Sequence, residues 1–353
     1  MLPDGATRYD TRTRREGTKT RGMKRLVVGM TLWAGLMGVA CAAGVRPLVL
    51  VTMPDMAAIV QAVAGDLVET QVVLPPGSDP HDFTISAAQV RSFGRSELVI
   101  YAASASHEFE TAIKSALRDK PSLDWDDYAA RGAALHDYPG YPRNPHAPWL
   151  HLDNAVAIAR AVAARLGQLG LSEGVLRARL QAFEQELAAQ RQTGLRVVQE
   201  RGLSGRPMLA MIPGVCDVIA NYGVPVGEVA MTEGSGTVAG RQLQEAVAQL
   251  RRGAYSAIVC PLSMRQSKQG EAARQLASDS GAPVVYVHFL DTRPGQDTYL
   301  SQVADNTAAL AAIGVRGAEP RTSPATTGAR LLAAGLLGLL LGIVIGRRLS
   351  RPR

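Results

Sequence analysis

Histidine is the side chain with which this sequence could bind a metal ion, because an imidazole nitrogen is a good ligand for zinc and copper. The chain has six histidines. One of them, His81, lies in a loop between two apolar, strand-like runs at residues 68–74 and 98–101. Ser86 and Gln89 form an S-x-x-Q capping box, which predicts a short helix after this loop. Ligand sites of α/β folds lie on such loops at the carboxyl edge of a sheet, so His81 is a candidate ligand.

The loop around His81 also carries a specific motif. The segment GSDPHDF at residues 77–83 resembles the G-x-DPH-x-(F/Y) signature of the zinc- and manganese-binding solute receptors of bacterial ABC transporters. The resemblance extends over about residues 48–310 and implies that His81 is a metal ligand. It further implies an exported receptor, not an enzyme, that works with an ABC transporter permease and its ATPase.

A second histidine ligand is implied by the same resemblance, in a PH-x-WL-x-P-x-N segment. The chain has NPHAPWLHLDN at this point, with one residue inserted between His146 and Trp149. His146 is the preferred ligand because it keeps the Asn-Pro-His context, in which the proline stiffens the approach to the ligand. His151 is the substitute, and the choice stays open at this point.

The third ligand position lacks a donor. The resemblance implies a His or Glu ten residues before Tyr222, where this sequence has Ile212. The nearest residues that could replace it are Cys216 and Asp217, which we expect on the following helix.

The closing aspartate of the family coincides with His288 in the run GAPVVYVH, so His288 is the expected last ligand. His107, in SASHEFE, is a less certain candidate. A site of His81, His146 and His288 favours zinc, with copper and manganese as lesser candidates, since manganese prefers carboxylate oxygen.

Cys216 and Cys260 are the only cysteines after residue 41. Because exported proteins meet an oxidising compartment, we predict that they form a disulfide. Two separate thiols, or Cys216 as a thiolate ligand, are the alternatives.

The net charge of +7 is concentrated at the two ends of the chain. Residues 1–42 and 330–353 carry +5 each, which leaves residues 43–329 at −3 and argues against a nucleic-acid partner. Residues 24–42 have a basic start, an apolar run and small residues at positions 40–42, as in a secretory signal. Lipidation of Cys41 is the lesser alternative. Residues 331–346 are apolar and uncharged and precede a basic tail, which predicts a transmembrane anchor with a cytoplasmic end.

Between these ends, short apolar runs alternate with amphipathic stretches, which predicts an α/β fold with two parallel-sheet (βα)n lobes. The apolar stripe of residues 173–201 predicts one long linking helix of roughly 43 Å. We expect the following layout: an N-terminal extension and signal peptide at 1–43, an N-terminal metal-binding lobe at 44–171, a linking helix at 172–202, a C-terminal metal-binding lobe at 203–315, a polar spacer at 316–329, a transmembrane anchor at 330–347 and a basic cytoplasmic tail at 348–353.

The function expected from these features is that of a receptor on the periplasmic or extracytoplasmic face of the membrane. It would bind zinc between two lobes and deliver it to an ABC permease. Three histidines would also suit a zinc-dependent hydrolase. The empty third position would suit a metal-free paralogue that acts as an adhesin or sensor.

Overall fold

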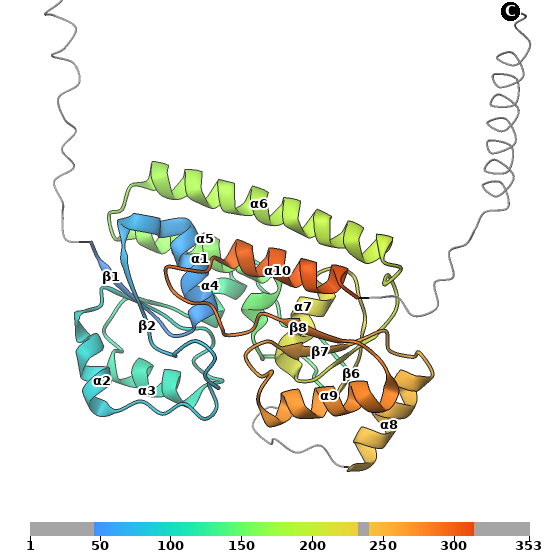
Figure 1. Cartoon of the computed structure of the whole chain (residues 1–353). Coiled ribbons are helices and arrows are strands. Elements are labelled where there is room, and N and C mark those ends of the chain that lie inside the picture. Colours follow the sequence, from blue (N-terminus) through green and yellow to red (C-terminus); the bar gives the residue numbers. More distant parts are fainter. Residues whose placement is uncertain (1–45, 232–239, 314–353) are drawn as a thin grey trace, which may run out of the picture. The chain divides into compact units, whose positions relative to one another are not determined.

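The computed structural model of the chain describes residues 46–231 and 240–313 (Figure 1). The expected signal peptide, polar spacer and transmembrane anchor lie outside these residues. Within the described ranges, no helix is both long and apolar enough to cross a membrane.

Two parallel four-stranded sheets form the framework, as the alternation of strands and helices predicted. The first sheet has the order β2-β1-β3-β4, and every neighbouring pair is parallel. Its strands are β1 (Leu48–Val51), β2 (Glu69–Val72), β3 (Leu98–Ile100) and β4 (Ser122–Leu123). The central strands β1 and β3 are apolar throughout and almost fully buried, as expected for a parallel sheet covered on both faces.

The second sheet repeats this arrangement with the order β6-β5-β7-β8. Its strands are β5 (Met208–Ala210), β6 (Val226–Val229), β7 (Ile258–Pro261) and β8 (Val284–Val287). Parallel strands end at one common edge of each sheet, so the loops that follow them bring distant parts of the sequence together.

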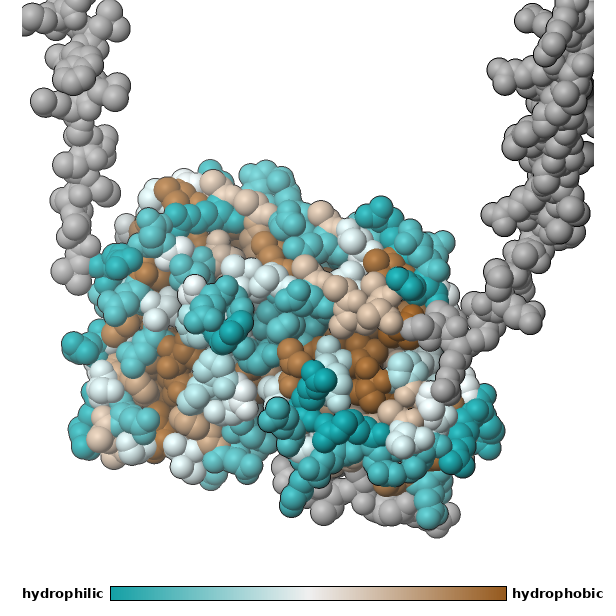
Figure 2. Space-filling view, in the orientation of Figure 1, coloured by the Kyte–Doolittle hydropathy of each residue, from teal (hydrophilic) through white to brown (hydrophobic). Residues whose placement is uncertain are grey.

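Helices surround both sheets. The N-terminal lobe, residues 46–171, contains α1 (Pro54–Ala64), α2 (Ala87–Ser92), α3 (Glu108–Ala116), α4 (Trp125–Ala129) and α5 (Leu152–Gln168). The C-terminal lobe, residues 203–231 and 240–313, contains α7 (Cys216–Ala220), α8 (Gly240–Arg251), α9 (Lys268–Ser280) and α10 (Tyr299–Ala311). Figure 2 shows hydrophilic residues over α9, while the rest of that face mixes hydrophilic and hydrophobic residues.

A single long helix, α6 (Glu173–Glu200), joins the lobes (Figure 1). Its buried side chains Leu176, Phe183 and Leu187 form the stripe that the sequence indicated. Further along, a methyl group added to Gly194 would come within 2.2 Å of the Tyr222 ring, so α6 can approach the C-terminal lobe only with glycine at this position. Helix α10 packs against both α6 and α1, so the end of the described chain returns to the N-terminal lobe.

The helix ends agree with the sequence in one case and differ in another. Ser86 and Gln89 form both hydrogen bonds of the predicted capping box at the start of α2. Asp153 directly precedes the helical pattern that begins at Asn154, which predicts a cap, but it does not cap α5. That helix begins at Leu152 with His151 at the capping position, and the Asp153 carboxylate instead accepts a hydrogen bond from Arg191 of α6 at 2.8 Å.

Buried hydrogen bonds hold the two lobes together. Asn144 Nδ2 of the N-terminal lobe donates to the Pro213 carbonyl at 3.0 Å. Asn221 of the C-terminal lobe accepts from the Leu152 amide at 2.9 Å and donates to the Leu150 carbonyl at 2.8 Å. Because buried polar groups are costly to leave unpaired, these bonds fix the segments on which the histidines lie.

Candidate metal centre

The loops after β2 and β3 and the loop before α5 bring three histidines together. The ring centre of His81 lies 5.8 Å from that of His107 and 6.1 Å from that of His146. We call His81, His107 and His146 the histidine trio. Two imidazoles on one tetrahedral zinc ion, with Zn–N bonds of about 2.0–2.1 Å, have ring centres roughly 5 Å apart. The His81 ring is therefore within about 1 Å of a spacing at which it could share an ion with His107 or with His146.

His81 is the exposed member of the trio. Its loop is held by Asp79, whose carboxylate accepts a hydrogen bond from the His81 backbone amide at 2.9 Å. An exposed histidine on a fixed loop is accessible to an ion from solvent.

His107 is buried and oriented by a carboxylate. Its Nδ1 lies 3.2 Å from Oε2 of the fully buried Glu110. Glu110 is itself fixed by the backbone amides of Ala102 and Ala103, at 2.8 and 3.1 Å. A carboxylate on one ring nitrogen is a common partner of metal-binding histidines, and it leaves Nε2 as the nitrogen that can coordinate.

His146 is oriented by a neighbouring amide. Its Nδ1 lies 2.7 Å from Asn144 Oδ1. Because Asn144 Nδ2 donates to the Pro213 carbonyl, its oxygen must accept, so we assign the proton of His146 to Nδ1. That tautomer leaves the lone pair on Nε2, as a metal ligand requires.

The inserted residue in NPHAPWLHLDN does not displace His146 from this group. Ala147 has a left-handed backbone conformation, with φ of 51°, and a short 3-10 helix at Pro148–Leu150 follows it. The extra residue is thus absorbed after His146, and His151 is carried to a different position. The geometry favours His146, the preferred residue, as the partner of His81.

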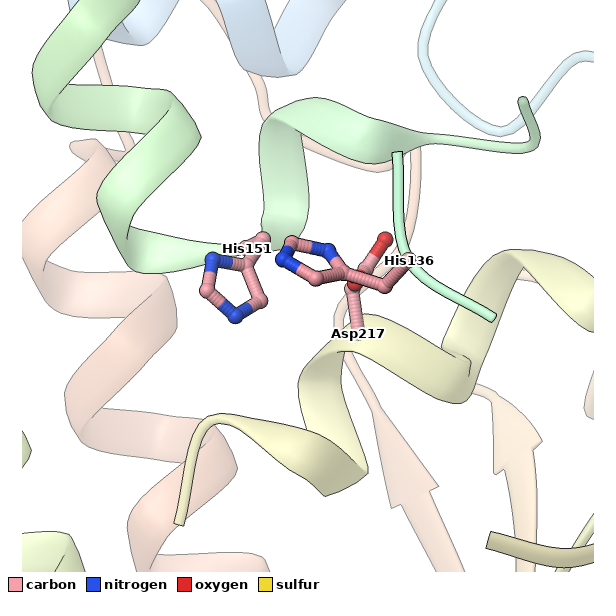
Figure 3. A group of neighbouring side chains, drawn as sticks. All are labelled: His136, His151 and Asp217. Carbon is pink, nitrogen blue, oxygen red and sulfur yellow. The ribbon is translucent and has the colours of Figure 1, made fainter. Parts of the chain in front are cut away.

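His151 belongs to a second group, with His136 and Asp217 (Figure 3). One ligand atom from each of these residues lies within 4.8 Å of the others. The two imidazole rings are 4.0 Å apart, and His136 Nδ1 lies 3.2 Å from Asp217 Oδ1. Asp217 comes from α7 of the C-terminal lobe, whereas both histidines come from the N-terminal lobe (Figure 3). We call these three residues the His-His-Asp group.

The two histidines of the His-His-Asp group have opposite electrostatic surroundings. The hydrogen bond with Asp217 raises the pKa of His136. Burial lowers the pKa of His151, which favours its neutral, metal-binding form. Tyr138 also donates a hydrogen bond to Asp217 Oδ1 at 2.6 Å, and burial beside this carboxylate raises the pKa of the tyrosine well above its usual value.

His288 lies at the end of β8 among carboxylates. Its Nδ1 is 3.0 Å from both oxygens of Asp291, and its Nε2 is 3.5 Å from Asp305. The hydrogen bond with Asp291 raises the pKa of His288. To bind a metal ion, His288 would have to exchange one of these carboxylate contacts for the ion.

The predicted disulfide is not present. Cys216 and Cys260 are both thiols, each fully buried. Cys260 lies within β7 and Cys216 at the start of α7, so the two do not face each other across a strand pair. Burial raises the pKa of the Cys260 thiol to about 12, which makes it an unreactive member of the core.

Ile212, at the third ligand position, is buried and offers no ligand atom.

Three functional candidates escaped the sequence analysis. His136 belongs to no motif of the sequence, and its pairing with Asp217 joins residues far apart in the chain. Asp291 follows His288 by three residues, as the chain turns back through Leu290 with φ of 53°. Glu110 follows His107 by three residues in α3, and the i,i+3 spacing of these two on a helix start was the one local signal available.

Two parallel α/β lobes, a single joining helix and histidines on the strand-end loops define a two-lobed solute-binding receptor. The model of the family described as zinc-uptake complex component A, periplasmic, matches residues 49–313. The chain belongs to this family, whose members are receptors for ABC-type metal uptake, located outside the cytoplasm, and not enzymes. This membership confirms the resemblance to metal-binding solute receptors that the DPH segment indicated. It also contradicts the alternative of a zinc-dependent hydrolase.

Solved structures with the same fold support this assignment at the level of architecture. The solute-binding protein FpvC of Pseudomonas aeruginosa in complex with Mn²⁺ has a TM-score of 0.64 at 16% identity, over 75% of this chain and 97% of that one. The periplasmic zinc-binding protein TroA of Treponema pallidum has a TM-score of 0.62 at 21% identity, over 77% and 100%. A periplasmic metal-binding protein of Candidatus Liberibacter asiaticus has a TM-score of 0.61 at 16% identity, over 76% and 99%. No curated protein sequence matches the chain significantly.

Proposed function

We propose that this protein is a membrane-tethered receptor that binds a zinc ion at the histidine trio and delivers it to an ABC permease and its ATPase. The observation that carries the proposal is the convergence of His81, His107 and His146 from three separate segments. Glu110 and Asn144 each hold one Nδ1, so Nε2 of His107 and His146 can bind the ion.

Zinc is the proposed ion because the ligands are imidazoles. Imidazole nitrogen suits zinc and copper, whereas manganese prefers carboxylate and water oxygen. The relatives of known structure do not decide the ion, since FpvC was solved with Mn²⁺ and TroA is described as a zinc-binding protein. The expectation for this chain therefore comes from its own side chains.

The ligand from the C-terminal lobe is proposed to be His288. It ends β8, at the strand-end edge of its sheet, where ligand sites of α/β folds form. Asp291 holds Nδ1 of this ring, as Glu110 holds that of His107, which leaves Nε2 for the ion once Asp305 yields its contact.

The domain layout and the tether belong to the same proposal. We assign residues 44–171 and 203–315 to the two metal-binding lobes and residues 172–202 to the linker. The anchor at residues 331–346 rests on its uncharged apolar run and the basic tail behind it.

Metal preference is tested by competition. The full chain in detergent, stripped of metal, is expected to bind zinc at least about 100-fold more tightly than manganese. The variant His288→Asp should narrow that gap, because it supplies the oxygen that manganese prefers. Equal affinity of the unmodified protein for the two ions would contradict the proposed zinc specificity.

Membrane topology is tested by proteolysis of intact spheroplasts. If the signal and the anchor act as proposed, added protease should digest residues 44–315 and leave only a small C-terminal fragment with the membrane. A protein that resists protease until the membrane is lysed would refute the exported, tethered arrangement.

A further inference from the structure

We propose that His136, His151 and Asp217 form a second binding site for a divalent transition-metal ion such as zinc. This site shares no residue with the histidine trio and does not depend on it. It joins the N-terminal lobe to the C-terminal lobe, because the histidines and the aspartate come from different lobes (Figure 3).

The spacing of the three residues fits a metal ion. Ligand atoms on one tetrahedral zinc ion are roughly 3.4 Å apart, from bonds of about 2.0–2.2 Å. Here one atom from each side chain already lies within 4.8 Å of the others. To bind an ion, the ligand atoms would have to close by up to about 1.4 Å, and the two rings, now 4.0 Å apart, would have to turn and open toward about 5 Å. Two imidazoles and one carboxylate are also a common ligand set for zinc, and the carboxylate offsets part of the charge of the ion.

Two buried polar atoms in the group have no hydrogen-bond partner, and both are potential ligand atoms. These are Asp217 Oδ2 and His151 Nδ1, in residues that are 1% and 8% exposed. The carboxylate nearest to His151 Nδ1, Asp153 Oδ2, is 3.8 Å away, too far for a hydrogen bond. An unpaired buried polar atom is destabilising, so two in one cluster point to a ligand that pairs with both.

The Asp217 carboxylate is held in place through one of its two oxygens, which leaves the other for an ion. Tyr138 donates to Asp217 Oδ1 at 2.6 Å, and His136 contacts the same oxygen. These contacts fix the carboxylate and leave Oδ2 as the oxygen without a partner. The His136 side chain is 33% exposed, so an ion can reach the group from its side. A cluster that served only to fasten the lobes would gain nothing from leaving Oδ2 and Nδ1 unpaired.

The test counts zinc equivalents on the metal-free full chain in detergent, by competition with a chromophoric chelator. The unmodified protein is expected to bind two equivalents. His136→Ala and Asp217→Asn should each weaken one of them by about 100-fold or more. His81→Ala should weaken only the other, and the exposed Asp119→Asn should weaken neither.

The outcomes separate this proposal from the one for the histidine trio. One equivalent that is lost in Asp217→Asn but kept in His81→Ala would support the second site and contradict the trio. Zinc binding that is indifferent to both His136→Ala and Asp217→Asn would overturn the second site. Cobalt absorption spectra of the two variants add a direct readout, since a change in ligands alters the cobalt bands whereas a purely structural role leaves them unchanged. His136→Ala, at a partly exposed residue, keeps the test valid if Asp217→Asn does not fold.

Discussion

Zinc affinity at the histidine trio is expected to fall by about two to four orders of magnitude when His81 and His146 are both replaced by alanine. Loss of one residue that only orients a ligand costs about 10–100-fold in metal affinity, so loss of two ligands must cost more. Their rings lie 6.1 Å apart and come from separate loops, and His107 is then the only member of the trio that remains.

The measurement is best made in the Asp217→Asn background, where only the trio would bind zinc. The matched control is Asp119→Asn in the same background, an exposed substitution in the same lobe. A double variant that keeps the affinity of the control would show that the ion binds elsewhere, and the proposed function would lose its main support.

Asp55→Ala is expected to destabilise the protein by about 3–5 kcal/mol, although Asp55 touches no proposed ligand. Its fully buried carboxylate accepts hydrogen bonds from the Leu290 amide at 2.9 Å, Gln302 Nε2 at 3.2 Å and Trp149 Nε1 at 3.4 Å, and also from the Thr292 hydroxyl. Removing the carboxylate leaves several buried donors without an acceptor. Each donor left unpaired in this way costs about 1–3 kcal/mol of stability.

Urea unfolding, followed by circular dichroism, measures this effect on the full chain in detergent. Asp119→Ala, on the exposed surface of the same lobe, should stay within about 0.5 kcal/mol of the unmodified protein. If Asp55→Ala unfolded at the same urea concentration as this control, the network around Asp55 would contribute little to holding the lobes together.

The architecture could be read from the sequence because local patterns determine it. Apolar runs such as residues 98–101 are typical of central strands of a covered sheet, and the capping box at Ser86 marks the start of α2 directly. The loop that carries His81 was found for the same reason, since a strand and a helix enclose it on either side.

The His-His-Asp group could not be read in this way. His136 and Asp217 are 81 residues apart and meet only because α7 lies against the loop before α5. No periodicity or spacing reports such a contact. The disulfide was wrongly predicted because an oxidising compartment makes pairing possible but does not bring two thiols face to face.

The surroundings of His288 could be predicted from the sequence only in part. The match of the run GAPVVYVH to the family pattern located the end of β8 correctly. It could not reveal that the chain reverses at Leu290, a non-glycine residue with positive φ. That reversal folds Asp291 back onto His288 and changes the character of the position from a lone imidazole to an imidazole-carboxylate pair.

The Asn144 side chain makes two hydrogen bonds that would couple separation of the lobes to release of the metal ion. Its amide nitrogen is tied to the Pro213 carbonyl in one lobe, and its amide oxygen is tied to the His146 ring in the other. If the lobes were drawn apart, the bond to Pro213 would break, and the amide could turn over once its oxygen also released the His146 backbone amide, from which it accepts at 3.2 Å. An NH₂ group would then face Nδ1 of His146, favour the opposite tautomer and place the proton on Nε2, the nitrogen proposed to bind the ion. Separation of the lobes would thus weaken the proposed binding of the ion through rotation of one amide.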